Sequence, residues 1–262
     1  MLSGIIIAAA VIGGVGLFIG AFLGFAGTAF AVPVDEKEAA VRSLLPGANC
    51  GGCGYSGCDA LAAAIAKGKA PVGACVVGGQ PVADEIASAL GTKAEKEERK
   101  VAFVRCSGDC EKTGNVYDYS GTKGCLEASF APAGGPKSCR FGCTGFGDCV
   151  KACEFEAISI QKGIAVVDEE KCRDCKKCIE ACPKHLIIEV PAGRISKIAC
   201  VNPNKGKAVM ENCKIGCISC QKCMKNCPAG AIDMTAGYPV IDYEKCTDCG
   251  TCKAGCPRKC IL

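Results

Sequence analysis

Residues 217–228 read Cys217-x2-Cys220-x2-Cys223-x3-Cys227-Pro228, and residues 246–257 repeat the pattern as Cys246-x2-Cys249-x2-Cys252-x3-Cys256-Pro257. Three closely spaced thiolates suit three irons of a cubane, and the fourth cysteine, with its proline, turns away to the partner cluster. The two runs therefore predict two 4Fe-4S clusters in one small pseudo-twofold domain. Structural zinc is the alternative, but it favours separated Cys-x2-Cys pairs over four cysteines in eleven residues.

The pattern also occurs upstream, with a period of 74 residues. Eight cysteines each have a cysteine 74 positions later: Cys139, Cys143, Cys149, Cys153, Cys172, Cys175, Cys178 and Cys182, paired with Cys213, Cys217, Cys223, Cys227, Cys246, Cys249, Cys252 and Cys256. The segments between them also match, because 157–168 and 231–242 both read as hairpins. Residues 139–182 and 213–256 therefore predict two tandem bacterial-type two-cluster ferredoxin modules of the α+β class.

One ligand is missing from the first module. Cys220 has no mate, because position 146 is Phe146, and Glu154 stands where proline is usual. Cys139 could supply this ligand. The crossover rule then gives four expected groups: Cys217, Cys220 and Cys223 with Cys256; Cys246, Cys249 and Cys252 with Cys227; Cys172, Cys175 and Cys178 with Cys153; and Cys143, Cys149 and Cys139 with Cys182. The spacing leaves open which of Cys139 and Cys213 serves which cluster.

A different cysteine motif precedes both modules, Cys50-x2-Cys53-x4-Cys58-x16-Cys75, in a glycine-rich setting. Glycines let backbone N–H groups approach an anionic cluster closely. Residues 35–45 and 59–67 read as short helices around this motif. We expect one more 4Fe-4S cluster here, with zinc as the alternative.

Six cysteines lie outside these motifs: Cys106, Cys110, Cys125, Cys200, Cys213 and Cys260. Cys106, Cys125, Cys200 and Cys213 could form a sixth cluster that bridges the two modules. The alternative is that several of them are buried thiols, which proteins tolerate well. The expected number of clusters is therefore about six and at least five, with Cys110 and Cys260 left over.

Residues 3–32 carry no charged side chain and are long enough to cross a bilayer. Small residues four apart, Gly16, Gly20 and Gly24, suit packing against a neighbouring membrane helix. A cleaved signal peptide is the alternative, but no basic segment precedes the apolar run. The expected domains are a single-pass transmembrane anchor (1–33, with 4–32 in the membrane), a small 4Fe-4S domain (34–82), a linker (83–100), the first ferredoxin module with an extension (101–200) and the second module (201–262).

The composition excludes several functions. The single histidine, His185, leaves little for histidine-based catalysis, and no nucleotide-binding glycine motif is present. The net charge of +4, with both signs well mixed, does not suggest nucleic-acid binding. With 26 cysteines and dense ferredoxin runs, we expect reduced thiolates on the cytoplasmic side of the membrane. No complete active site is expected on this chain.

The order of parts resembles the B subunits of Rnf ion-translocating ferredoxin oxidoreductase complexes, in their long, cluster-rich form. The resemblance is carried by the apolar N-terminal segment, the run Asn49-Cys50-Gly51-Gly52-Cys53-Gly54 with Cys58 and Cys75, and the ferredoxin modules. It implies a cell-membrane translocase in which this subunit accepts electrons from soluble reduced ferredoxin and passes them to the other membrane subunits.

An alternative from the ferredoxin modules alone is a membrane-anchored electron-transfer subunit of another ferredoxin-linked hydrogenase or dehydrogenase. Basic residues near the cysteine loops could steer an acidic ferredoxin to the chain, although many of them are expected to be ordinary solvated surface. These residues are Lys171, Arg173, Lys176, Lys177, Lys253, Arg258 and Lys259.

Overall fold

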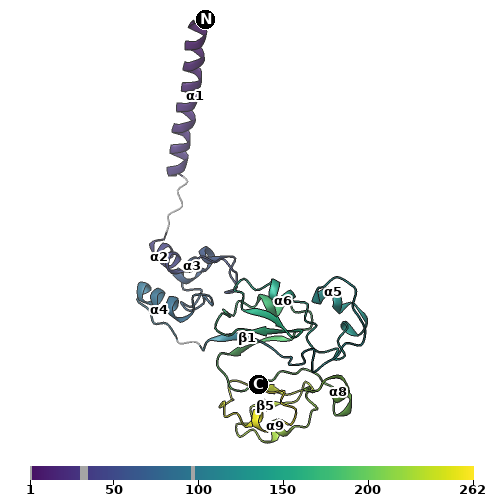
Figure 1. Ribbon diagram of the computed structural model, residues 1–262. Coiled ribbons are helices and arrows are strands. Elements are labelled where there is room, and N and C mark those ends of the chain that lie inside the picture. The colour runs from purple at the N-terminus through teal and green to yellow at the C-terminus, as the bar shows by residue number, and fades with distance from the viewer. Residues whose placement is uncertain (1, 30–34, 96–97) are drawn as a thin grey trace.

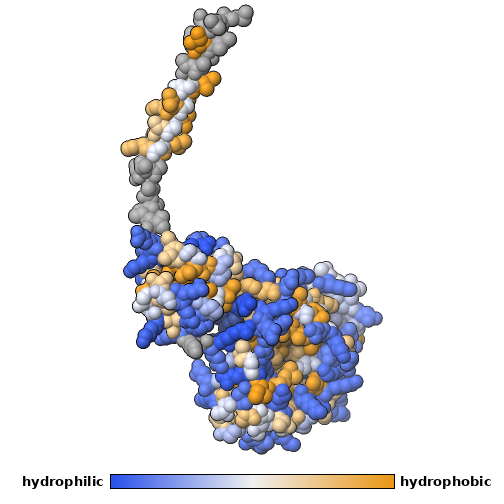
Figure 2. Space-filling view, turned by 60° about the vertical axis from the view of Figure 1, so that its left-hand side comes forward, coloured by the Kyte–Doolittle hydropathy of each residue, from blue (hydrophilic) through white to orange (hydrophobic). Residues whose placement is uncertain are grey.

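The computed structural model describes residues 2–29, 35–95 and 98–262. Helix α1 (Leu2–Ala29) stands apart from the rest of the molecule, and large apolar side chains such as Leu17 and Phe18 are exposed along it (Figures 1 and 2). Where side chains are described, no helix has the length and apolar character to cross a membrane. The N-terminal anchor therefore stays a prediction, and its expected end at Pro33 lies outside the described residues.

The small domain contains three helices: α2 (Glu36–Leu44), α3 (Cys58–Ala66) and α4 (Gly79–Leu90). Asp35 caps α2 by accepting from the Lys37 N–H at 2.9 Å, as N-cap carboxylates do. Val41, Leu61 and Ile86, one from each helix, form its fully buried centre. The first two helices confirm the helices predicted at 35–45 and 59–67.

The predicted linker at 83–100 is wrong at both of its ends. Ala83, Ile86 and Ala87 are buried in α4, so the small domain extends to residue 90. The alanines and the isoleucine recur at helical spacing, and this pattern seats α4 against α2. At the other end, Lys100 already pairs in a strand, while residues 96–97 lie outside the described ranges.

The first ferredoxin module is built on two antiparallel pairs of strands. Strand β1 (Lys100–Val104) pairs with β4 (Ile187–Pro191), so the two ends of the module are joined; sequence patterns did not indicate this pair. The hairpin of β2 (Ile158–Gln161) and β3 (Ile164–Val167) is as predicted. The remaining elements are short: α5 (Cys125–Ser129), the 3-10 turn η1 (Pro132–Gly134), α6 (Asp148–Lys151) and α7 (Lys177–Glu180).

The second module repeats this plan with shorter strands (Figure 1, green to yellow): α8 (Lys207–Asn212), α9 (Lys222–Lys225), β5 (Ile232–Asp233), β6 (Val240–Ile241) and α10 (Thr251–Ala254). The β5–β6 hairpin confirms the predicted one. Ile198 forms a bridge with Ile261, and the Ala199 N–H donates to the Cys260 carbonyl at 2.9 Å. The second module thus begins before the boundary expected at 200/201.

Candidate iron–sulfur sites

Five cavities among the described residues are each lined by four or more cysteines. We name the cysteine groups by letter: group A is Cys50, Cys53, Cys58 and Cys75; group C is Cys125, Cys143, Cys149 and Cys182; group D is Cys106, Cys139, Cys200 and Cys213; group E is Cys217, Cys220, Cys223 and Cys256; and group F is Cys227, Cys246, Cys249 and Cys252.

A further group surrounds Cys178. Burial raises the pKa of the Cys178 thiol to about 12, and the neighbouring thiols of Cys172, Cys175 and Cys153 raise it as well. These four cysteines form group B. Groups A, B, E and F have the members that the spacing and the crossover rule predicted.

Groups C and D differ from the expectation by one exchange. Cys125, expected with the bridging cysteines, lies with Cys143, Cys149 and Cys182, and Cys139 lies in group D instead. The exchange follows from α5, which begins at Cys125 and is held against α6 because the Leu126 N–H donates to Asp148 Oδ2 at 3.0 Å. The 24 cysteines expected as ligands are unchanged as a set.

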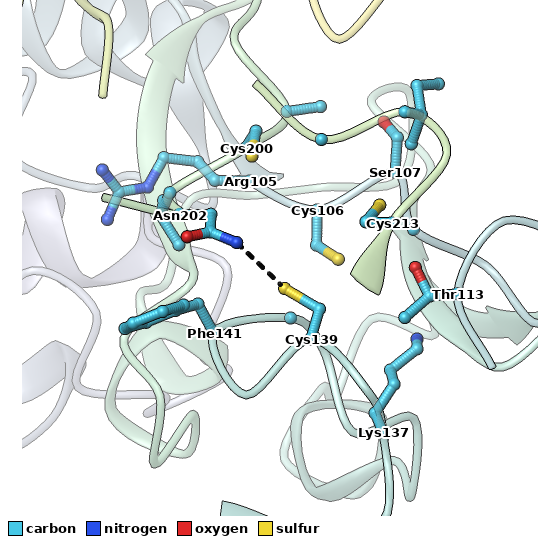
Figure 3. A pocket seen from close by; sticks show the side chains of 16 residues that line it. Arg105, Cys106, Ser107, Thr113, Lys137, Cys139, Phe141, Cys200, Asn202 and Cys213 are labelled. Atoms are coloured by element: carbon cyan, nitrogen blue, oxygen red, sulfur yellow. Dashed lines mark hydrogen bonds between the residues drawn. The ribbon is translucent and has the colours of Figure 1, made fainter. Parts of the chain in front are cut away.

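Group D consists of two pairs of equivalent cysteines, and Figure 3 shows the four side chains around one cavity. Cys139 and Cys213 are mates of the 74-residue repeat. Cys106 and Cys200 are also equivalent, because each follows a strand-like segment that closes its module: Val104 pairs with Ile187, and Ile198 with Ile261. Their spacing is 94 residues. An insertion within 107–138 lengthens the first module by 20 residues, so these two cysteines do not follow the 74-residue period.

The cysteine loops have the donor chemistry that iron–sulfur clusters require, because backbone N–H groups donate to sulfur in every group. In five groups these bonds are 3.3–3.4 Å long: Gly78 to Cys75, Ala102 to Cys172, Ala157 to Cys153, Leu186 to Cys182, Cys143 to Cys106, Cys217 to Cys200, Ala231 to Cys227 and Asp248 to Cys246. In group E the Cys260 thiol is the main cause of the lowered pKa of Cys217, and the backbone N–H of Ser219 lowers it further. The backbone N–H of Met224 opposes the rise in pKa that burial causes at Cys223.

None of the cysteines forms a disulfide. All 26 are free thiols. Among the described residues, no three His, Cys, Asp or Glu side chains converge on a single-ion site.

Burial disfavours the ionised form of several of these thiols. It raises the pKa of Cys149 to about 12 and of Cys200 to about 11, with nearby thiols adding to the effect. Thiolates, the form that binds metal, are therefore favoured in these cavities only when a cation balances their charge. Four thiols around one cavity, with N–H donors on the sulfurs, fit a cubane of four irons and four sulfides.

The two cysteines left over differ from each other. Cys110 is exposed, whereas Cys260 is buried and lines the cavity of group E. The Cys260 sulfur lies 3.6 Å from Cys256 Sγ. A hydrogen bond from the Cys260 thiol also lowers the pKa of Cys217 to about 6, and the same bond raises the pKa of Cys260 itself.

The six groups neighbour one another in the order A, B, C, D, E, F. Gly52 of the group A loop lies against Cys175 of group B, and Cys178 of group B shares one hydrophobic core with Cys149 of group C. The hydrogen bonds from Cys143 to Cys106 and from Cys217 to Cys200 join group D to its neighbours on both sides. Groups E and F share one hydrophobic core.

Two of the basic residues considered for docking are engaged in ion pairs. Lys176 Nζ lies 3.0 Å from Glu189 Oε1, and Lys177 forms an ion pair with Glu154. Arg258 turns inward, where it donates to the carbonyls of Gly216 and Cys213. These pairings reduce the charge that this part of the surface offers to a partner.

Family models match three segments of the chain. The model described as "Putative Fe-S cluster" matches residues 45–77, and models described as 4Fe-4S dicluster domains match residues 138–186 and 216–261. They cover the group A loop and the two predicted ferredoxin modules. The presence of 4Fe-4S clusters is thus supported by three independent segments.

Similar proteins span the whole chain. The chain is 44% identical, over its full length and 78% of the relative's, to the B subunit of the Na(+)-translocating ferredoxin:NAD(+) oxidoreductase complex of Acetobacterium woodii. It is 42% identical to the B subunit of the ion-translocating oxidoreductase complex of Methanosarcina acetivorans, over all of this chain and 99% of that one. A proton-translocating relative from Clostridium ljungdahlii is 38% identical over 94% of the chain and 88% of the relative.

These relatives are all B subunits of ion-translocating complexes, so they support the Rnf family over the alternative of a hydrogenase or dehydrogenase subunit. The cysteine groups fit the family's electron-carrying role, because they gather cysteines in sets of four around buried cavities. The chain belongs to the family of B subunits of Rnf ion-translocating ferredoxin:NAD oxidoreductase complexes and is an iron–sulfur electron-transfer subunit.

Proposed function

We propose that the chain holds six 4Fe-4S clusters, one in each of groups A to F, as a single file of electron carriers. Each cluster supplies reversible one-electron chemistry when bound, at a potential set by burial and hydrogen bonding. The observation that carries the proposal is the order of the groups, in which neighbours are joined by direct contacts such as the 3.3 Å hydrogen bonds on either side of group D.

Soluble reduced ferredoxin, we infer, docks on the second module. Of the 24 cysteines in the six groups, only Cys220 and Cys249 are exposed, and both belong to this module. An exposed ligand marks the point where an electron has the shortest path from a partner. Residues 201–262 contain nine Lys or Arg and five Asp or Glu, whereas residues 1–200 contain 22 of each, so the whole net charge of +4 lies here. This sign suits an acidic partner.

The other end of the file belongs next to the membrane. Group A lies in the small domain, which follows the apolar segment 4–32. With this segment as a single-pass anchor in the cell membrane and the cluster modules on the cytoplasmic side, group A is the exit toward the other Rnf membrane subunits.

The test is an analysis of iron, acid-labile sulfide and zinc in the full chain, purified without oxygen. Six cubanes require about 24 irons and about 24 sulfides per chain. A value of about 20 would mean that one group is empty, while the electron-carrier role would stand. Zinc in place of iron would contradict the proposal.

A further inference from the structure

The cavity of group D differs from the others in its buried polar residues. The described ranges contain seven buried polar or charged residues, and four of them line this cavity: Ser107, Thr113, Lys137 and Asn202 (Figure 3). The cavity of group F has one, Ser196, and no buried cation, and the cavities of groups A, C and E have none. Burying polar groups costs free energy unless they find partners, so their concentration around four thiols is informative.

Hydrogen-bond donors point at three of the four sulfurs of group D. The Asn202 side-chain amide donates to Cys139 Sγ at 3.6 Å, shown by the dashed line in Figure 3, while the backbone N–H groups of Cys143 and Cys217 reach Cys106 and Cys200. Asn202 is only 3% exposed. A hydrogen-bond donor therefore reaches three of the four sulfurs of group D.

The fourth sulfur, that of Cys213, has a hydroxyl beside it. A Cβ placed on Gly108 would lie 2.6 Å from Thr113 Oγ1 and 3.3 Å from Cys213 Sγ, so these two atoms occupy the same corner of the cavity. Thr113 is 3% exposed, and its hydroxyl has no hydrogen-bond partner within the described residues. A buried hydroxyl without a partner needs an acceptor, and an anionic cluster with its thiolate ligands would provide one.

Positive charge also gathers at this junction. Lys137 Nζ donates to the carbonyls of Cys143 and Gly163 at 2.9 and 3.3 Å and forms no ion pair among the described carboxylates. Lys184 and Arg258, which are mates of the 74-residue repeat, donate to the equivalent carbonyls of Gly142 and Gly216 at 3.1 and 3.2 Å. Each module therefore directs a cation at the loop that carries one of its group D cysteines.

Reduction adds negative charge to a cluster. Hydrogen-bond donors and cations stabilise that charge, more strongly in a buried cavity than in water, and thereby raise the reduction potential. On the basis of the proposed function, we propose that group D holds the cluster of highest reduction potential in this chain, tuned by Thr113, Lys137 and Asn202. Electrons that enter through the second module then collect at the junction between the modules on their way to group A.

The test is a redox titration of the full cluster-loaded chain, followed by electron paramagnetic resonance. In Thr113→Val, which removes only the hydroxyl, we expect the wave of highest potential to move to a lower midpoint while the other waves and the iron content stay unchanged. Thr113→Ser keeps the hydroxyl and should restore the wild-type midpoint. The matched control is Thr122→Val, because Thr122 is exposed and lines none of the five cavities.

Asn202→Asp is a second variant that does not depend on Thr113. The Asn202 side-chain oxygen accepts from the Asn204 N–H at 2.9 Å, and aspartate keeps this bond while it replaces the donor to Cys139 with a negative charge. We expect a larger downward shift of the same wave. Unchanged waves in both variants at full iron content, or a shift confined to a lower wave, would overturn the inference alone. A chain that binds zinc would overturn the proposed function itself.

Discussion

At the scale of single residues, Cys125 shows how a missing ligand is replaced. Position 146 holds Phe146 where the repeat predicts cysteine. The Phe146 ring packs on Tyr119 with ring centroids 5.3 Å apart, so the aromatic residue helps to hold the inserted segment that carries Cys125. Phe146, which stands where the repeat predicts a cysteine, thus helps to position Cys125, the cysteine that takes its place in group C.

This arrangement predicts different results for two cysteines in the same insertion. Cys125→Ala should lose about four irons per chain, because a cubane needs its four protein ligands. Cys110→Ala is the matched control, since Cys110 is exposed and belongs to none of the six groups, and it should keep the wild-type iron content. Iron and sulfide analysis checks both. If Cys125→Ala held as much iron as the wild type, Cys139 and not Cys125 would be the fourth ligand of group C.

At the scale of elements, the contact between the small domain and the first module depends on one glycine. A Cβ on Gly52 would lie 3.1 Å from Cys175 Cα and 3.2 Å from Val76 Cγ2, which is tighter than ordinary packing. The two cysteine loops approach this closely because position 52 has no side chain. Groups A and B are neighbours as a consequence.

We expect Gly52→Val to push these loops apart and to slow electron delivery from ferredoxin to the membrane subunits severalfold, at unchanged iron content. The measurement is the ferredoxin-dependent rate of the assembled complex. Gly73→Val is the control, because a Cβ there would meet only Ala83, at 3.9 Å. A Gly52→Val complex as fast as wild type would mean that electrons do not cross this contact.

At the scale of the whole molecule, the apolar helix lies at one end, and the net positive charge and the exposed cysteines of the six groups lie at the other. The apolar α1 is at one end, and the second module, with its excess of lysines, is at the other (Figures 1 and 2). Lys222 and Lys225 bound the short helix α9, two residues beyond the exposed Cys220, and neither forms an ion pair among the described residues. They are the cations we expect an acidic ferredoxin to meet.

The double variant Lys222→Glu/Lys225→Glu should slow reduction of the chain by ferredoxin, most strongly at low ionic strength, because salt screens long-range steering. Stopped-flow absorbance at several salt concentrations measures this rate. Reversal of Lys176 and Lys177 is the comparison, and a smaller effect is expected because both lysines already pair with glutamates. A larger effect of the Lys176/Lys177 reversal would move the docking face to the first module.

Most of the local architecture was predictable from sequence. The tight cysteine runs, the hairpins at β2–β3 and β5–β6 and the helices α2 and α3 follow from short-range spacing, where neighbouring residues decide the structure. The β1–β4 pair was missed because its strands are more than 80 residues apart and show no distinctive pattern. The extent of α4 was missed because the charged run at 93–100, which lies beyond the helix, made the whole of 83–100 resemble a linker.

The sequence by itself determined the family, the two ferredoxin modules and the set of 24 candidate ligands, since the fixed spacing of cysteines on a short loop leaves cubane geometry few alternatives. Only the tertiary structure decided which of Cys125 and Cys139 joins each group, and that group D is ringed by Thr113, Lys137 and Asn202. These contacts join segments from both modules across an insertion. Their geometry depends on how the chain folds back on itself, which local spacing does not encode.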